Sequence, residues 1–530
     1  MGVPKFYGQW LRHKLHNINI QLPSNVYALC IDVNSLIHQS AQIVYSYGEY
    51  KNEERLKYIK NLTDRELEDE LYQTLGTKLL NIITAVRPTD MLVIAVDGVA
   101  PLSKINQQRQ RRYKSSLNPV DRFAVNQISP GTNFMRRLDR YIRKWIKSNS
   151  NILPAKIIYS SHMVVGEGEQ KIYDILRKYN KSPVVVHGLD TDLIMLSLVC
   201  PIEDIYLIRD NVILSIRSIK DVIGIPPKEF VLICYLIGND FIPNLLYLEE
   251  KRTSIDTLID VYRSVGLKLV NDNMINWQNM SIFFTELAKR EPDLILNEAL
   301  KEMKNPLEVL GNSLIYTPEP KLDYDGFRSL WYKRELEGNE YYKVTDDRIM
   351  NMCKQYVTTL QWIYTYYTEG ADKVNKMWFY PYFRAPLSID LIKVDSIGNE
   401  YSYEYGPDFI NPLYQLVAIL PANDYKLLPK PMQGLTKPNS EIYDMYPSKF
   451  IIDHEGKEQD WESIAIIPPP EIDRIIEAVD KLVDDNIIKK FEVEDDMIID
   501  NTSTTILQQQ NKTILDAINK YRYRYRYRRK

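Results

Sequence analysis

Seven acidic residues stand beside glycines or at the ends of apolar segments, where their carboxylates could gather around a metal. They are Asp32, Asp97, Glu167, Glu169, Asp190, Asp192 and Asp240. A single Asp after a strand is usually a helix cap or a turn residue. Two acidic pairs at i, i+2 beside glycines, with three further acids, are harder to explain in that way.

Converging carboxylates repel one another and lose hydration unless cations neutralise them. No His or Cys lies in these motifs, so the pattern disfavours zinc and predicts an all-oxygen site for Mg²⁺, with Mn²⁺ as a substitute. Two such ions about 3.5–4 Å apart would suit phosphodiester hydrolysis.

A basic helix is expected directly after Asp97. Residues 98–120 contain no acid, and Pro101 marks the first helical turn. Within this helix Lys104, Gln108, Arg111 and Arg112 stand at i, i+4, i+7 and i+8, so they share one face. Four donors beside a metal cluster could bind a terminal phosphate through charge-assisted hydrogen bonds. The alternative is a solvated basic face.

The elements that must position these residues alternate between strands and helices. Buried strands are predicted at Val26–Ile31, Met91–Val96, Lys156–Tyr159 and Pro183–Val186. Amphipathic helices are predicted at Asp64–Val86 and Gly131–Lys147, and an edge hairpin at Ile205–Ile208 and Val212–Ile216. This alternation predicts an α/β fold with a mostly parallel central sheet flanked by helices. Ligands gather beyond the carboxyl ends of such strands, where most of the acids lie.

The rest of the chain has a different character. Residues 227–304 and 316–387 are helical in pattern, 390–470 are more irregular, and a further helix is expected at Pro470–Asp485. An acidic segment, Glu492–Asp500, precedes a polar stretch and the repeat Tyr521–Lys530. That Tyr-Arg repeat is either an RNA-binding arm or a solvated tail.

Composition limits the functional classes. The net charge of −3 gives no global sign of nucleic-acid binding, and a second basic stretch, Arg136 to Lys147, contains one acid, Asp139. The four cysteines form no CxxC pair, so buried thiols in a reducing compartment are expected rather than a zinc site. No apolar run is long enough to span a bilayer, and no membrane association is expected. Abundant Ile, Asn, Lys and Tyr are typical of an AT-rich coding genome, as in some protists or large DNA viruses.

The chain resembles the XRN-type 5′→3′ exoribonucleases through a series of ordered motifs. In the first part these are Met1–Phe6, Asp32–His38, DGVAPLSKINQQRQRRY from Asp97, Ile128–Thr132, GEGEQKI from Gly166, Asp190–Leu193 and Gly238–Pro243. Gln361–Tyr367, Trp378–Pro381, Ala385-Pro386, Gln415-Leu416, Leu420-Pro421 and Tyr446-Pro447 resemble the family's second conserved region.

The resemblance implies roles for individual residues. The seven acids fall on the family's metal ligands, and Lys104, Gln108, Arg111 and Arg112 on its 5′-monophosphate pocket. His38 falls on a residue that stacks against the leading bases, with Asn34 nearby in the active site. Trp362 and Trp378 are expected to be core residues, although one could supply the opposing stacking face.

The resemblance implies a PIN/FEN-like α/β nuclease core at 1–245 and a helical extension at 246–312. A mainly helical second conserved region at 313–485 would pack on the active site, followed by the acidic segment and tail at 486–530. The implied activity is processive 5′→3′ hydrolysis of 5′-monophosphorylated single-stranded RNA to mononucleotides by two-metal catalysis. A cytoplasmic monomer is expected, with the nucleus or a viral factory as alternative locations and the decapping machinery as a candidate partner.

Several residues depart from the family pattern. Val165 and Gln170 flank the Gly-Glu-Gly-Glu core where Pro and His are usual, and Ser35 replaces a glycine. The 530 residues are not expected to include the long C-terminal domains of large members. Two other classes remain open: a flap endonuclease, which shares the acidic sheet edge, and a catalytically silent RNA-binding scaffold. Cleavage of branched flap DNA, or binding of RNA without cleavage, would distinguish them.

Overall fold

The computed structural model describes residues 3, 6–15, 20–209, 212–248, 252–301, 305–306, 308–315, 319–336, 344–398, 410–457 and 462–500. The polar stretch after Asp500 and the Tyr-Arg repeat lie outside these residues, as does most of the Met1–Phe6 motif. None of the helices in these ranges is both long and apolar enough to cross a membrane.

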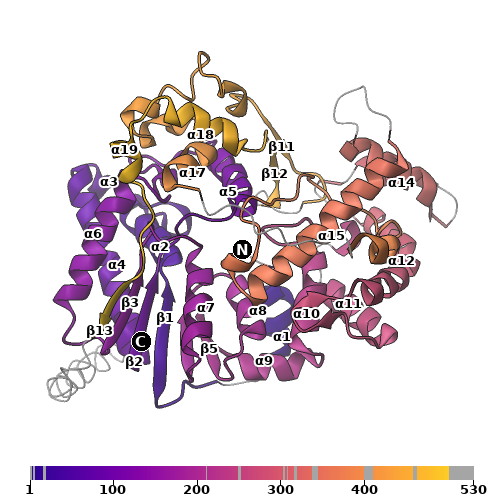
Figure 1. The fold of residues 1–530 in the computed structure, drawn as a ribbon, viewed down its shortest axis with the longest axis horizontal. Helices are drawn as coiled ribbons and strands as arrows, with labels where there is room; N and C mark the ends of the chain where they lie inside the picture. Colours follow the sequence, from indigo (N-terminus) through magenta and orange to yellow (C-terminus); the bar gives the residue numbers. More distant parts are fainter. Residues whose placement is uncertain are drawn as a thin grey trace.

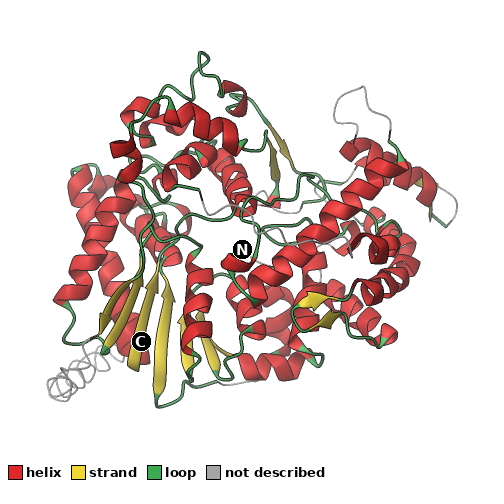
Figure 2. Cartoon of the chain, in the orientation of Figure 1, coloured by secondary structure: helices red, strands yellow, loops and turns green. Residues whose placement is uncertain are grey.

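A seven-stranded sheet forms the centre of the N-terminal half, with strand order β13-β3-β2-β1-β4-β5-β6 (Figure 2). Its strands are β1 (Val26–Asp32), β2 (Pro88–Ala95), β3 (Lys156–Ser160), β4 (Val184–His187), β5 (Ile205–Arg209), β6 (Val212–Ser215) and β13 (Met497–Asp500). The strands from β3 to β5 pair in parallel, and β6 and β13 are antiparallel edges. The predicted mostly parallel sheet and its edge hairpin are therefore confirmed.

Helices cover both faces of the sheet because successive side chains of a strand point to opposite sides. Leu29 and Ile31 of β1 join one apolar core, whereas Ala28 and Cys30 join the other. The first core is covered by α2 (Asn34–Tyr45), α4 (Asp64–Val86) and α6 (Asn133–Ser148). The second is covered by α7 (Gly168–Tyr179), α8 (Asp192–Val199), α9 (Ile216–Ile223) and α10 (Pro227–Cys234) (Figure 1).

The edge strand β13 was not expected. It belongs to the acidic segment, yet it pairs with β3 so that Ile498 lies opposite Ile158. Met497 and Ile499 pack on the sheet core while Ile498 is exposed. Its partner lies more than three hundred residues earlier in the chain, so local sequence gave only the short Met-Ile-Ile run as a signal.

Two further groups of elements complete the molecule (Figure 1). One contains α11 (Arg252–Val265), α12 (Trp277–Ala299), α14 (Tyr324–Leu336) and α15 (Asp346–Thr368). The other contains α17 (Pro412–Ile419), α18 (Ile472–Asp480), α19 (Asp485–Lys489) and the hairpin of β11 (Ile451–Asp453) and β12 (Ile464–Ile466). The helix expected at 470–485 corresponds to α18, which ends five residues earlier than predicted, at Asp480.

The basic helix, α5 (Leu102–Ser115), is held between the nuclease core and the α17–α18 group. Its Leu102 and Ile105 pack in the same apolar cluster as α17 and α18. Arg109, which is 1% exposed, donates hydrogen bonds to the carbonyls of Pro468 at 3.1 Å, Ala418 at 2.7 Å and Met445. One member of the basic run thus serves to join two parts of the fold.

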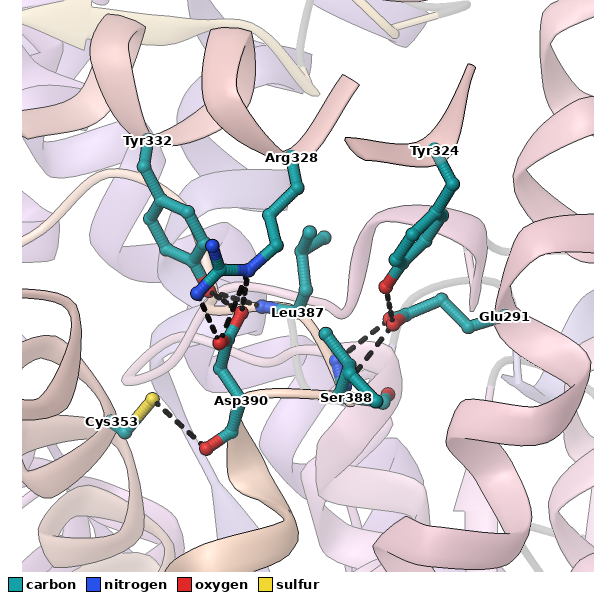
Figure 3. Close-up of polar contacts among 9 residues, drawn as sticks. Glu291, Tyr324, Arg328, Tyr332, Cys353, Leu387, Ser388 and Asp390 are labelled. Carbon is teal, nitrogen blue, oxygen red and sulfur yellow. Dashed lines mark hydrogen bonds and ion pairs between the residues drawn. The ribbon is translucent and has the colours of Figure 1, made fainter. Parts of the chain in front are cut away.

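A buried polar network fastens the loop at 387–390 to α12 and α14 (Figure 3). The Glu291 carboxylate accepts hydrogen bonds from the Ser388 and Ile389 amides and from the Tyr324 hydroxyl, at 2.7, 3.2 and 2.5 Å. Beside it, the Asp390 carboxylate is paired with Arg328 at 2.6 Å. These contacts link the segments 246–312 and 313–485; the proposed division of the chain between them stays a prediction.

Candidate active site

The acids of the first two strands reach one edge of the sheet because β1 and β2 run in parallel. Asp32 ends β1 and is registered with Ala95, two residues before Asp97. Asp190 follows the end of β4, and Glu167 is the residue before the first turn of α7. The carboxyl ends of parallel strands form the expected ligand-binding edge.

A cavity of about 500 Å³ lies over this edge and is bounded on its other side by α5. Among its lining residues are Asp32, Asn34, His38, Asp97, Lys104, Gln108, Arg111, Arg112, Glu167, Glu169 and Asp190. The acids and the basic face predicted from sequence thus border one space. Asp192 and Asp240 lie outside the lining but beside it, through Asp190 and Lys104 respectively.

Three carboxylates are close enough to share one ion: oxygens of Glu169, Asp190 and Asp192 lie within 4.8 Å of one another. Asp192 is 1% exposed, and neither of its carboxylate oxygens accepts a hydrogen bond of normal geometry from the described residues. The Tyr367 hydroxyl nevertheless lies near Asp192. Burial is the main cause that raises the pKa of Tyr367, and the charge of Asp192 is the second. A buried carboxylate with unmet oxygens fits a cation ligand.

The cluster carries more negative charge than its surroundings neutralise. Burial, followed by the charges of Asp97 and Asp190, raises the pKa of Asp32 to about 8. Burial and the charge of Asp190 raise the pKa of Asp192 to about 7. Burial also raises the pKa of Glu169 well above its usual value. A divalent cation would relieve this repulsion, so the donor set fits a metal.

Lys104 lies among the acids rather than only on the basic face. Its ammonium is 2.5 Å from Glu167 Oε2 and 2.8 Å from Asp240 Oδ2, and all three side chains are buried. Although burial opposes it, this pairing holds the pKa of Asp240 well below its usual range. The i, i+4 spacing correctly predicted that Lys104 faces the cavity, but it could not reveal these two ion-pair partners.

Asn34 and Gly168 hold the Asp97 carboxylate in place. Asn34 Oδ1 accepts a hydrogen bond from the Asp97 backbone amide at 3.1 Å, and Asn34 Nδ2 donates to the Asp97 carboxylate. The Gly168 amide also donates to Asp97, at 2.8 Å. A Cβ at Gly168 would lie 3.0 Å from an oxygen of Asp32, so a glycine allows the carboxylates to approach α7.

The basic face of α5 presents Gln108, Arg111 and Arg112 to the cavity. Arg112 donates to the Ile128 carbonyl at 3.2 Å, and burial with the charge of Arg111 lowers its pKa to about 10. Both the Gln108 carbonyl oxygen and Arg112 Nε are buried without a hydrogen-bond partner among the described residues. Such unmet groups are suited to a polar ligand.

His38 borders the cavity in an uncharged state. Burial, with the nearby charges of Arg112 and Arg111, lowers the pKa of His38 to about 4. The ring is half-buried, so part of it remains accessible from the cavity. A neutral ring offers a flat face without adding to the positive charge.

Sequence reasoning missed several residues that support the site. The hydroxyl of Tyr366, in α15, donates to Glu167 at 2.9 Å. The Lys171 ammonium donates to the carbonyls of Val96 and Ser161, at 2.7 and 2.8 Å, joining α7 to the end of β2 and the loop after β3. Both residues occur within the quoted motifs, but neither spacing nor residue type indicated these contacts.

The two tryptophans singled out from sequence differ in exposure. Trp362 is 4% exposed, stacks on Tyr366 at 4.9 Å between ring centres and donates to the Asn375 carbonyl, so it is a core residue. Trp378 is half-buried and donates to Thr359 at 3.1 Å. Neither residue lines the cavity.

Family models match both parts of the chain. One, described as "XRN 5'-3' exonuclease N-terminus", matches residues 1–211, and another, described as "Xrn1 helical domain", matches 228–313 and 295–521. The second match alone extends over more than half of the chain.

Curated relatives share moderate identity with this chain. A human "5'-3' exoribonuclease 1" is 27% identical over 91% of this chain and 34% of its own length. A Drosophila melanogaster "5'-3' exoribonuclease 2 homolog" is 24% identical over 90% of this chain and 71% of its own. A Schizosaccharomyces pombe "5'-3' exoribonuclease 1" is 22% identical over 90% and 48%. The chain thus spans between about a third and about seven tenths of the length of these relatives.

A solved structure, "The catalytic core of Rad2 in complex with DNA substrate", is 16% identical and matches 69% of this chain and 99% of its own. Its TM-score of 0.32 is too low to support an inference.

Proposed function

Because the chain belongs to the XRN family of 5′-3′ exonucleases, we propose that it is a 5′→3′ exoribonuclease. It hydrolyses 5′-monophosphorylated single-stranded RNA and releases mononucleotides processively. The single observation that carries this proposal is the cavity that borders both the acidic cluster and the basic face of α5. Metal-assisted cleavage and recognition of a phosphorylated end both require groups of this kind in one space.

The acidic cluster is proposed to hold two Mg²⁺ ions, with Mn²⁺ as a substitute. Their ligands would come from Asp32, Asp97, Glu167, Glu169, Asp190, Asp192 and Asp240. Bound ions would neutralise the scissile phosphate and supply an activated water. The burial of Asp192 and the raised pKa values of Asp32 and Asp192 support this assignment, because they reflect a repulsion between buried carboxylates that bound cations would relieve.

The basic face selects the end of the substrate. Arg111 and Arg112 provide guanidinium donors for a terminal phosphate, and Gln108 adds a side-chain amide. Lys104 contributes its positive charge from a place between the acidic cluster and the basic face, since its ammonium already contacts Glu167 and Asp240. Holding the 5′ phosphate fixes the first phosphodiester over the acids and converts binding geometry into rate.

The neutral ring of His38 is proposed to stack on the leading bases, with Asn34 orienting Asp97 below it. Stacking of this kind tolerates any sequence because every base has a π-face. A stacked, splayed strand excludes duplex, so base-paired RNA must be melted as it enters.

We also propose that the enzyme acts as a monomer in the cytoplasm, on RNA ends exposed by the decapping machinery. The four cysteines are free and buried, which supports a reducing compartment.

Digestion of four RNAs that differ only in the 5′ group tests the proposed function. With Mg²⁺ present, we expect rapid degradation of monophosphate RNA and little of triphosphate, capped or hydroxyl RNA. Asp190→Ala/Asp192→Ala should abolish degradation without loss of folding. Equal rates on hydroxyl and monophosphate RNA would contradict the phosphate pocket, whereas RNA binding without any cleavage would favour a silent scaffold. Preferential cleavage of branched flap DNA would favour a flap endonuclease.

A further inference from the structure

The wall of the cavity beside Arg112 includes a residue that sequence reasoning did not single out. Asn126, in the short helix Val125–Gln127, lines the cavity and is 5% exposed. Its side-chain oxygen accepts hydrogen bonds from Arg112 Nη1 at 3.4 Å and from the Ser115 hydroxyl at 3.1 Å. Its side-chain nitrogen donates to the Asp424 carboxylate at 2.6 Å.

Asp424 fixes which way the Asn126 amide points. An ionised carboxylate can only accept hydrogen bonds, so the amide nitrogen must face Asp424 and the amide oxygen must face Arg112. Asp424 comes from the segment Ala422–Leu427, about 300 residues after Asn126. The α17–α18 group thereby sets the orientation of a side chain in the cavity wall.

This arrangement uses up one side of the Arg112 guanidinium. The Asn126 oxygen and the Ile128 carbonyl take Nη1 and Nη2, while Nε keeps an unmet N–H. The wall therefore presents acceptor oxygens, backed by the negative charge of Asp424. A first phosphate can use the remaining donors of Arg111 and Arg112. Further phosphates extending toward the wall would meet oxygens that already accept hydrogen bonds, with the Asp424 charge behind Asn126, and they would lose hydration without compensation.

We propose that Asn126 and Asp424 form an end wall that limits this cavity to a single 5′ phosphate. Asn126 is a positioning residue that holds Arg112, and Asp424 is the specificity determinant that disfavours diphosphate and triphosphate ends. The inference rests on the proposed function, because it concerns the same phosphate pocket.

The primary variant is Asp424→Asn, which removes the charge and keeps the shape. We expect the preference in kcat/KM for monophosphate over triphosphate RNA to fall about tenfold, equivalent to about 1.4 kcal/mol. The change should come mainly from a lower KM for triphosphate RNA. Asp473→Asn, an exposed acid of α18, is the matched control and should leave the preference unchanged.

Asn126→Ala tests the positioning role. Losing the hydrogen bond to a charged guanidinium should raise KM for monophosphate RNA about tenfold while kcat changes little. An unchanged KM in Asn126→Ala would overturn the positioning role. An unchanged end-group preference in Asp424→Asn, or equal losses on both RNAs together with a lower unfolding temperature, would overturn the wall.

Binding in EDTA separates this inference from the proposed function. Short RNAs with one, two or three 5′ phosphates are compared by competition, so that no cleavage is needed. Suppose that wild type cleaves none of these RNAs in Mg²⁺ but binds the monophosphate RNA most tightly in EDTA, and that Asp424→Asn removes this binding preference. The proposed function then fails and the wall stands. If wild type cleaves monophosphate RNA but binds all three equally, the wall is wrong and the function stands.

Discussion

Replacing Asp192 with Asn removes a buried charge that lowers the free energy of unfolding of the metal-free protein. Burial and Asp190 raise the pKa of Asp192 from 3.8 to about 7. At about 1.4 kcal/mol per pKa unit, the ionised form costs about 4 kcal/mol at pH 8. Since an amide in the same place must also find hydrogen bonds, we expect Asp192→Asn to stabilise the metal-free protein by about 2 kcal/mol.

Asp240→Asn is the matched comparison because it changes the same atoms in the same cluster. Lys104 holds the pKa of Asp240 low, so the ionised form of Asp240 stabilises the fold. Its loss leaves the Lys104 ammonium with Glu167 alone and should destabilise the protein by about 3 kcal/mol. Two neighbouring charge removals are thus expected to have opposite signs, although both should abolish cleavage.

The pH dependence follows from the direction of each pKa change. Folded Asp192 keeps its proton up to about pH 7, whereas the unfolded chain releases it near pH 4. The folded state therefore binds more protons, and its stability falls as pH rises through this window. Asp240 behaves in the opposite way: its contribution is present above the unfolded pKa and is lost as pH falls toward the lower folded value. The advantage of Asp192→Asn should accordingly be larger at pH 8 than at pH 5.

Thermal unfolding at pH 5 and pH 8, in EDTA and in excess Mg²⁺, measures these effects. In EDTA at pH 8, wild type should unfold at a lower temperature than Asp192→Asn. Mg²⁺ should raise the unfolding temperature of wild type more than that of the variant. If Asp192→Asn destabilised the metal-free protein as much as Asp240→Asn does, the Asp192 charge would not be costly in the fold. If Mg²⁺ raised the unfolding temperature of Asp192→Asn as much as that of wild type, Asp192 would not be a metal ligand.

Three further substitutions address residues that hold the site in place. Tyr366→Phe removes the hydrogen bond to Glu167 and should weaken Mg²⁺ activation about tenfold or more without lowering the unfolding temperature, as a metal titration of activity would show. Arg109→Ala should destabilise the chain by about 3–5 kcal/mol in denaturant unfolding, since three carbonyls lose a buried donor; Arg109→Lys should not restore it. Glu291→Ala leaves the buried Ser388 amide and the part-buried Ile389 amide unpaired and should cost about 3 kcal/mol in the same measurement, with the Mg²⁺ requirement unchanged.

The sheet could be predicted because its strands carry strong local signals. Continuous β-branched apolar runs gave β1, β2, β3 and β4 to within a few residues at each end. The acids also follow from this order, since the parallel register of β1 and β2 brings Asp32 near Asp97. By contrast, β13 has a short apolar run within an acidic segment and depends on a distant partner. Such pairings are set by tertiary contacts that local pattern does not record.

The basic helix shows a different limit of sequence reasoning. Helical spacing correctly brought Lys104, Gln108, Arg111 and Arg112 to one cavity. The spacing could not predict which groups the basic side chains contact. Lys104 pairs with two acids, whereas Arg109, only one residue from Gln108, joins α5 to the α17–α18 group. Long basic side chains reach several ångströms in any direction, so spacing fixes their face but not their contacts.

The site cannot be a property of the N-terminal α/β core alone. The core supplies the acids at its strand ends, but Glu167 also takes a hydrogen bond from Tyr366 of α15. The Ala100 amide, just after Asp97, donates to the side chain of Gln415 in α17. Asp424 orients Asn126 beside Arg112. Each contact joins an active-site group to a residue at least 190 positions further along the chain. Truncation after residue 245 would therefore remove the groups that orient Glu167 and Arg112, while all seven acids and their mutual repulsion would stay in place.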